Sequence, residues 1–186
     1  MAEPEEFPGP QDDDLDEILR SGKPGDKLPE ELGGGLTSEI ENLLPRELNE
    51  KPVTVVGVYE HQEEGMPPAA FVLLRDASAR QVVIWIGRFE AYAISAALEN
   101  ALYDRPMTHD LLSIMVDRLG ARVEKIIIDD LWQDTYYAKI MLINNKDESV
   151  QVDARPSDAI ALALRAKAMI FMAESVLEQA SANEQM

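Results

Sequence analysis

The pattern of apolar and polar positions changes near Lys51, where an irregular polar stretch gives way to short runs rich in β-branched and aromatic residues. Three such runs are separated by turn residues and therefore predict antiparallel strands. They cover residues 53–60, 69–75 and 81–86. Trp85 lies in the third run and is expected in the core. Gly87 closes this run, and apolar residues then recur at helical spacing over 89–102, which predicts a helix.

A second helix is predicted between Thr108, a residue type that caps helices, and Gly120, a residue type that ends them. Apolar residues within it recur at helical spacing. They are Leu111, Leu112, Met115, Val116 and Leu119. This single stripe indicates an amphipathic helix.

The pattern then starts again with three more strand-like runs, which lead into a helix rich in small residues. The runs cover residues 123–131, 135–144 and 149–152. Pro156 suits the first turn of the following helix, whose apolar residues form one buried stripe. A short strand at 169–172 and a helix at 173–180 complete the predicted elements.

The two halves of this pattern look like copies of one unit. Placing 93–98 over 159–164 gives four identical residues in six. The fold class predicted is therefore α+β, with mainly antiparallel strands and helices, built as two copies of a three-strand-then-helix unit in one domain.

Residues 1–50 differ in composition from the rest of the chain. They hold 15 acidic and 4 basic residues, a net charge of −11, and they contain few large apolar groups. We therefore expect an acidic, largely disordered tail over 1–50 and one folded domain over 51–186. The tail is expected either to keep the chain in solution or to bind a basic partner. In the second case, one helical turn over residues 14–20 would serve as the docking motif.

Composition also limits the function. The chain contains no run of 18 apolar residues and no secretory signal, so no membrane association is expected. It has no cysteine, which fits a reducing compartment, and cytoplasmic is the expected location. The net charge of −18 argues against loose binding of nucleic acid by charge alone, because such binding needs many Lys or Arg contacts to phosphate.

The candidate chemistry lies where strands or loops lead into helices. One such junction, 87–90, offers an arginine and a glutamate, and another, 153–158, offers an arginine and an aspartate. A third helix start adds His109 and Asp110. Carboxylates and a histidine are ligands for Mg²⁺ or Mn²⁺, and an arginine beside them would hold a phosphate. Acidic residues at helix starts are, however, also what capping and the helix dipole favour, so a structural role competes.

Three motifs resemble the bifunctional nuclease domain family. They are Ile84–Ala91, Thr108–Leu112 and Val152–Arg165. Their order and spacing match the family over about residues 51–180. The resemblance implies a bacterial member with an α+β domain and nuclease activity on RNA and DNA. No P-loop, Rossmann glycine pattern, HExxH or GxSxG motif points to another enzyme class.

The resemblance places the candidate site at the matching motif positions. They are Arg88, Glu90, His109, Asp110, Arg155 and Asp158. In our hypothesis Glu90, Asp110 and Asp158 hold Mg²⁺ or Mn²⁺ and position water. His109 would act as general base or acid, and Arg88 and Arg155 would bind phosphate.

Two functions remain open on the sequence. The first is a metal-dependent nuclease for RNA and DNA. The second is a non-catalytic binding or regulatory module for an anionic ligand or a protein partner. Carboxylates that converge would favour the first, whereas carboxylates held in caps and salt bridges would favour the second. A homo-oligomer is expected for a compact bacterial domain of this size, and exposed alanine-rich helix faces would point to it.

Overall fold

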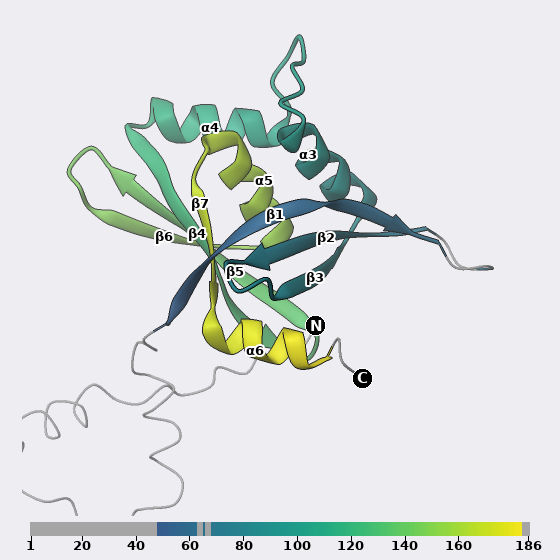
Figure 1. Ribbon diagram of the computed structural model, residues 1–186. Helices are drawn as coiled ribbons and strands as arrows, with labels where there is room; N and C mark the ends of the chain where they lie inside the picture. The colour runs from purple at the N-terminus through teal and green to yellow at the C-terminus, as the bar shows by residue number, and fades with distance from the viewer. Residues whose placement is uncertain (1–47, 63–64, 66–67, 184–186) are drawn as a thin grey trace, which may run out of the picture. The chain divides into compact units, whose positions relative to one another are not determined.

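The computed structural model of the protein describes residues 48–62, 65 and 68–183 (Figure 1). All but the last three residues of the predicted tail lie outside this part of the chain, so the tail and its boundary stay predictions. In the described part, no helix has the length and apolar character needed to span a membrane.

The described residues form seven strands and four helices, and the fold class is α+β as predicted. The strands are β1 (Glu50–His61), β2 (Ala69–Asp76), β3 (Gln81–Ile86), β4 (Ala121–Trp132), β5 (Thr135–Asn144), β6 (Ser149–Ala154) and β7 (Met169–Ala173). The helices are α3 (Arg88–Leu98), α4 (Thr108–Arg118), α5 (Pro156–Ala166) and α6 (Glu174–Asn183). Every predicted strand and helix in this region is therefore present.

All seven strands belong to one sheet, in the order β3-β2-β1-β7-β4-β5-β6. Neighbouring strands are antiparallel except for β4 and β7, which are parallel. The two predicted groups of three strands thus lie on either side of β7, and α3 or α5 follows each group. That the groups are copies of one unit remains a prediction.

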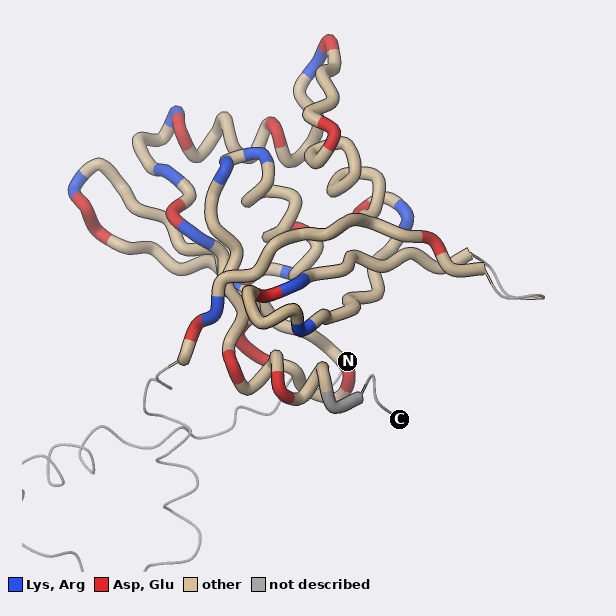
Figure 2. The backbone as a smooth tube through the Cα atoms, viewed as in Figure 1, with Lys and Arg blue, Asp and Glu red and all other residues tan. Residues whose placement is uncertain are grey.

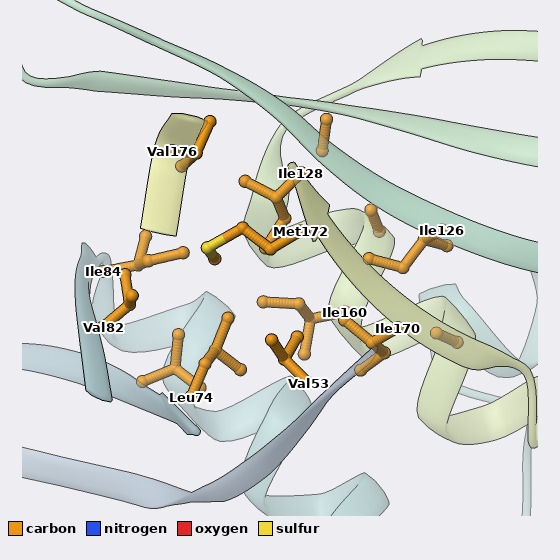
Figure 3. Close-up of a cluster of buried hydrophobic side chains, with 14 of the residues drawn as sticks. Val53, Leu74, Val82, Ile84, Ile126, Ile128, Ile160, Ile170, Met172 and Val176 are labelled. Atoms are coloured by element: carbon orange, nitrogen blue, oxygen red, sulfur yellow. The ribbon is translucent and has the colours of Figure 1, made fainter. Parts of the chain in front are cut away.

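Buried and more accessible residues alternate along the strands, as expected for a sheet with one face turned to the core. In β2, for example, Ala70, Val72 and Leu74 are buried while the residues between them are more accessible. Such residues from β1, β2, β3, β4 and β7 meet the buried faces of α5 and α6 in one core (Figure 3). Figure 3 shows Ile160 of α5 and Val176 of α6 facing this core from different sides.

The sheet is curled. Helix α6 contacts both β3 and β4, although three strands separate these two in the sheet. The other three helices lie together, with α5 contacting both α3 and α4 (Figure 1). This grouping brings the N-terminal turns of α3, α4 and α5 into one region.

The alanine-rich faces are buried. Ala159, Ala161 and Ala163 of α5 are completely enclosed, and Ala96 and Ala97 of α3 are nearly so. Small side chains allow α3 and α5 to approach closely, which positions the residues at their starts. These faces therefore do not offer a surface for a partner, and the homo-oligomer expected from the sequence stays a prediction.

Three local predictions differ from the structure. Helix α3 ends at Leu98 rather than at 102, because Asn100 adopts a left-handed φ of 52° and the Ala101 N–H bonds back to the Ala96 carbonyl. Thr108 is the first residue of α4 and not its cap, which is Met107. Trp85 is exposed on the outer face of β3, with its ring edge-on to Phe71 at 5.2 Å between centroids.

Candidate functional site

Four of the six predicted site residues meet where α3, α4 and α5 begin. Glu90 lies in the first turn of α3, His109 in the first turn of α4, and Asp158 in the first turn of α5. Arg155 immediately precedes α5. We call Glu90, His109, Arg155 and Asp158 the junction cluster.

Arg155 lies at the centre of the junction cluster. Its Nε donates to Asp158 Oδ2 at 2.8 Å and its Nη2 to Asp158 Oδ1 at 3.3 Å. Its Nη1 lies 3.1 Å from Glu90 Oε1. The Arg155 side chain is 67% exposed, so the guanidinium faces solvent while it joins α3 to α5.

His109 completes the junction cluster from α4. Its Nε2 lies 3.3 Å from Asp158 Oδ1, and its side chain is only 16% exposed. When Nε2–H donates to this carboxylate, Nδ1 of the neutral ring carries the lone pair. A carboxylate that orients an imidazole in this way is the arrangement used by many general bases.

The ionisation of Asp158 follows from these contacts. Partial burial acts to raise the pKa of its carboxyl, but the hydrogen bonds and charge of Arg155, helped by His109, hold the pKa below its ordinary value. The hydrogen bonds and charge of Asp158 also raise the pKa of Arg155. Both groups are therefore charged at neutral pH.

Gly87 gives Glu90 the room it needs. A Cβ at position 87 would collide with the Glu90 carboxylate, which folds back over the start of α3. Glycine here therefore lets Glu90 reach Arg155. A side chain at this position would displace the Glu90 carboxylate.

Two cavities flank the Glu90–Arg155 pair, and both residues line each cavity. The first cavity, of about 330 Å³, also contains His109 and Asp158, with Phe89 and Tyr92 on its wall. The second, of about 350 Å³, lies toward β3 and the start of β5. The junction cluster therefore adjoins enough space for a small ligand or for part of a larger one.

Asp110 and Arg88 do not belong to this arrangement. Asp110 accepts the backbone N–H of Met107 at 3.0 Å and pairs with Arg165 Nε at 3.1 Å. Its carboxylate therefore holds the start of α4 to α5. Arg88 is exposed, lines neither cavity, and forms no ion pair with any described residue. Their predicted roles are not tested by this geometry.

The carboxylates do not fit the expected metal site in their present arrangement. Among the described residues, no three His, Asp or Glu side chains form a group that could hold a metal ion. Glu90 and Asp158 are bonded to Arg155, and Asp110 to Arg165. A cation at these oxygens would have to displace an arginine, so metal ligation by these three carboxylates stays a prediction.

Three residues of the site region were missed as site candidates. Arg165 lines the first cavity and also donates to the Ala101 carbonyl at 3.3 Å. It lies seven residues after Asp158 and so shares a helix face with it, which was a usable signal. Phe89 and Tyr92 line the same cavity, but no sequence signal separated them from core aromatics.

Comparison with known proteins places this α+β domain in a family. The sequence model of the bifunctional nuclease domain matches residues 72–185, and the chain belongs to that family. This result confirms the resemblance inferred from the three motifs.

Relatives are bacterial and plant proteins. An uncharacterized protein of Mycobacterium tuberculosis is 39% identical over 129 residues, which are 69% of this chain and 74% of the relative. Bifunctional nuclease 1 of Oryza sativa subsp. japonica is 32% identical over 110 residues, or 58% of this chain and 33% of the relative. Bifunctional nuclease 1 of Arabidopsis thaliana is 30% identical over 102 residues, which are 54% of this chain and 31% of the relative. The match thus spans about a third of each plant protein.

Proposed function

We propose that the protein is a nuclease that hydrolyses phosphodiester bonds in single-stranded RNA and DNA at the junction cluster. The observation that carries this proposal is the contact of His109 and Arg155 with the same carboxylate, Asp158, beside a cavity. Membership of a family with members named bifunctional nucleases supports the reaction class.

Arg155 is assigned to the phosphate. A guanidinium has five N–H groups, and three of them are used by Asp158 and Glu90. The remaining two are free to donate to phosphate oxygens, and the exposed side chain makes them accessible. Because Arg155 is held by two carboxylates, its position is set before the substrate arrives.

His109 is assigned as the general base. Its Nδ1 takes a proton from a water molecule, and the resulting hydroxide attacks phosphorus. The bond between phosphorus and the leaving oxygen breaks, and that oxygen is protonated by solvent. Asp158 accepts from Nε2–H, keeps the ring in this tautomer and stabilises the imidazolium that forms. A water nucleophile acts on RNA and DNA alike, since it does not need the 2′-hydroxyl.

The aromatic wall of the first cavity supports a single-stranded substrate. Phe89 is 89% exposed and Tyr92 is half-exposed, and both lie beside Arg155 in the cavity lining. Exposed rings next to a phosphate-binding arginine are suited to stack unpaired bases. Stacking also provides affinity that does not depend on charge, which matters in a domain whose residues 51–186 carry a net charge of −7, from 20 acidic and 13 basic residues.

Mg²⁺ or Mn²⁺ remains a proposal. Glu90 and Asp158 could serve as ligands only after Arg155 moves away, and Asp110 only after Arg165 does. When bound, such an ion would lower the pKa of a coordinated water. Cleavage assays in the presence of EDTA decide whether this route is used.

The second candidate function, a binding or regulatory module, also has an observation in its favour. All three predicted metal ligands are engaged in salt bridges, and Asp110 in addition bonds the start of α4. This is the arrangement that we expected of a non-catalytic site. Arg155 would then hold an anionic ligand without any bond being broken.

One experiment separates the two functions. Labelled single-stranded RNA and DNA are incubated with wild-type protein in Mg²⁺, Mn²⁺ or EDTA, beside Asp158→Asn and the matched control Asp153→Asn. Asp153 is an exposed residue of β6 close in sequence to the junction cluster. Cleavage that is lost only in Asp158→Asn supports the nuclease, with folding checked by circular dichroism. Binding without cleavage supports the module, and equal cleavage by all three proteins contradicts this site.

A further inference from the structure

Helix α4 has its apolar side turned outward. His109, Ser113 and Val116, spaced by four and three residues, are half-buried and face the molecule. Leu111, Ile114 and Met115, on the opposite side, are exposed, and no residue of α4 is buried. This is the reverse of a helix that covers a core by itself.

The exposed apolar side chains form one surface on and beside α4, which we call the α4 patch. It consists of Leu102, Leu111, Leu112, Ile114, Met115 and Leu119. Leu102 is 96% exposed and lies in the connection between α3 and α4, which projects outward beside the start of α4 (Figure 1). Leu119 is 81% exposed and follows the other end of the helix.

The area of the α4 patch suits a dimer. If a fully exposed large side chain presents about 150–200 Å², the exposed fractions of the six residues amount to on the order of 600 Å². A standard interface buries about 800 Å² per partner, of which roughly 65% is apolar in homodimers, or about 500 Å². An apolar patch of this size is at the upper end of the roughly 300–600 Å² that the largest patch on a monomer covers, and such patches are often functional.

The charges around the α4 patch favour a second copy of the same chain. The protein carries a net charge of −18, so two copies repel each other over most of their surface. At the α4 patch, however, Asp104 precedes Arg105 and Asp117 precedes Arg118, so each acidic residue of these two pairs is next to a basic one. Figure 2 shows red and blue segments side by side on the connection between α3 and α4 and near the end of α4. These paired charges lower the repulsion between two copies at this surface.

We propose that the α4 patch is the interface of a two-fold symmetric homodimer in which the α4 helices of the two copies pack antiparallel. A symmetric interface places the same surface on both sides. Antiparallel packing brings the projecting Leu102 of one copy toward Leu119 of the other, so the two most exposed leucines cover each other. It also places Met115, near the middle of the pair, close to its own counterpart.

The dimer would also support the site. His109 lies on the half-buried side of α4, and the outer side of the same helix lacks cover in a single copy. Covering that side stabilises the helix that holds the imidazole. The proposal does not depend on the nuclease function, because the α4 patch is defined by exposure and charge alone.

The test is the molecular mass of the full chain in solution, measured by light scattering or sedimentation over a range of concentrations. We expect twice the chain mass of 20.7 kDa for the wild type. Met115→Glu should raise the dimer dissociation constant at least about tenfold, because it places two like charges in the centre of the interface. Circular dichroism should show unchanged folding, since Met115 is 51% exposed.

Val150→Glu is the matched control, because Val150 is similarly exposed but lies on the edge strand β6. A dimer lost in Val150→Glu and kept in Met115→Glu would overturn the proposal and place the interface at the sheet edge. A wild-type chain that stays monomeric at every concentration would overturn it as well.

Cross-linking then tests the antiparallel packing directly. The chain has no native cysteine, so single Leu102→Cys and Leu119→Cys variants can be mixed without background. We expect a disulfide between the two variants on oxidation. Cross-linking no greater than that of a Val150→Cys control would overturn the antiparallel arrangement.

Discussion

Replacing Arg155 with methionine removes the group that joins Glu90, Asp158 and, in our proposal, the phosphate. The structure leaves two of its five N–H groups for the substrate, since the other three contact the carboxylates. Losing one preorganised donor to a developing oxyanion typically lowers kcat by about 10²–10³-fold. We therefore expect Arg155→Met to lose at least about 100-fold in kcat/KM on a single-stranded oligonucleotide.

Stability should change much less than activity. The Arg155 side chain is 67% exposed, and exposed ion pairs contribute little to folding. The melting temperature is therefore expected to fall by no more than about 4 °C. Arg155→Lys should be intermediate in activity, because an ammonium keeps the charge but cannot contact both carboxylates and the phosphate with a planar fork.

The assay compares initial cleavage rates with melting curves for the same preparations. Arg122→Met, an exposed arginine of β4, serves as the control for loss of one positive charge. Cleavage by Arg155→Met equal to that of the control would refute the reasoning. A large loss of melting temperature alongside activity would refute the claim that Arg155 acts mainly on the substrate.

Three further predictions concern other parts of the protein. Burial acts to raise the pKa of the Asp76 carboxyl, but the hydrogen bonds and charge of Arg80 outweigh burial and hold this pKa below its ordinary value. Hydrogen bonds from Arg80 also lower the pKa of Glu174. The ion pairs of Arg80 with Asp76 and Glu174 therefore contribute their full stability at a pH above the ordinary pKa values of the two carboxyls. This stability is lost as the pH falls through the lowered pKa values that the carboxyls have in the folded protein. Melting curves should show this acid loss in the wild type, and Arg80→Met should reduce or reverse it. Gly87→Ala should displace the Glu90 carboxylate and lower kcat/KM about 10- to 100-fold, with little change in melting temperature. Unchanged kinetics would show that the position of Glu90 does not matter for cleavage. Phe89→Ala should weaken binding of a single-stranded oligonucleotide by about 1–3 kcal/mol in a fluorescence titration while leaving duplex binding unchanged; equal effects on both would contradict base stacking.

The sequence predicted the elements well where local signals agree. Proline at position 156 began α5 as expected, and Gly120, with a φ of 77°, followed α4. The end of α3 was placed too late, because Asn100 can adopt the left-handed conformation without a glycine to mark it. Periodicity also found the apolar stripe of α4 but could not tell that it faces outward, since spacing defines a face without defining what covers it.

The junction cluster was predicted in its members but not in its contacts. Glu90, His109 and Asp158 were chosen for their places at helix starts, and the packing of α5 against α3 and α4 brings them together. Arg155, rather than a metal ion, joins Glu90 to Asp158. Its contact with Glu90 links residues 65 positions apart in the sequence, and no local sequence pattern contains such a contact. The same holds for the pairing of Asp110 with Arg165.

The most direct test of the proposed site is the cleavage of one labelled single-stranded oligonucleotide by wild-type protein and by His109→Gln, measured side by side in EDTA and in Mg²⁺. A glutamine preserves a hydrogen bond to Asp158 but cannot accept the proton from water. We predict a loss of about 10²–10⁴-fold in kcat under the condition in which the wild type cleaves. Cleavage by His109→Gln at the wild-type rate would contradict the account.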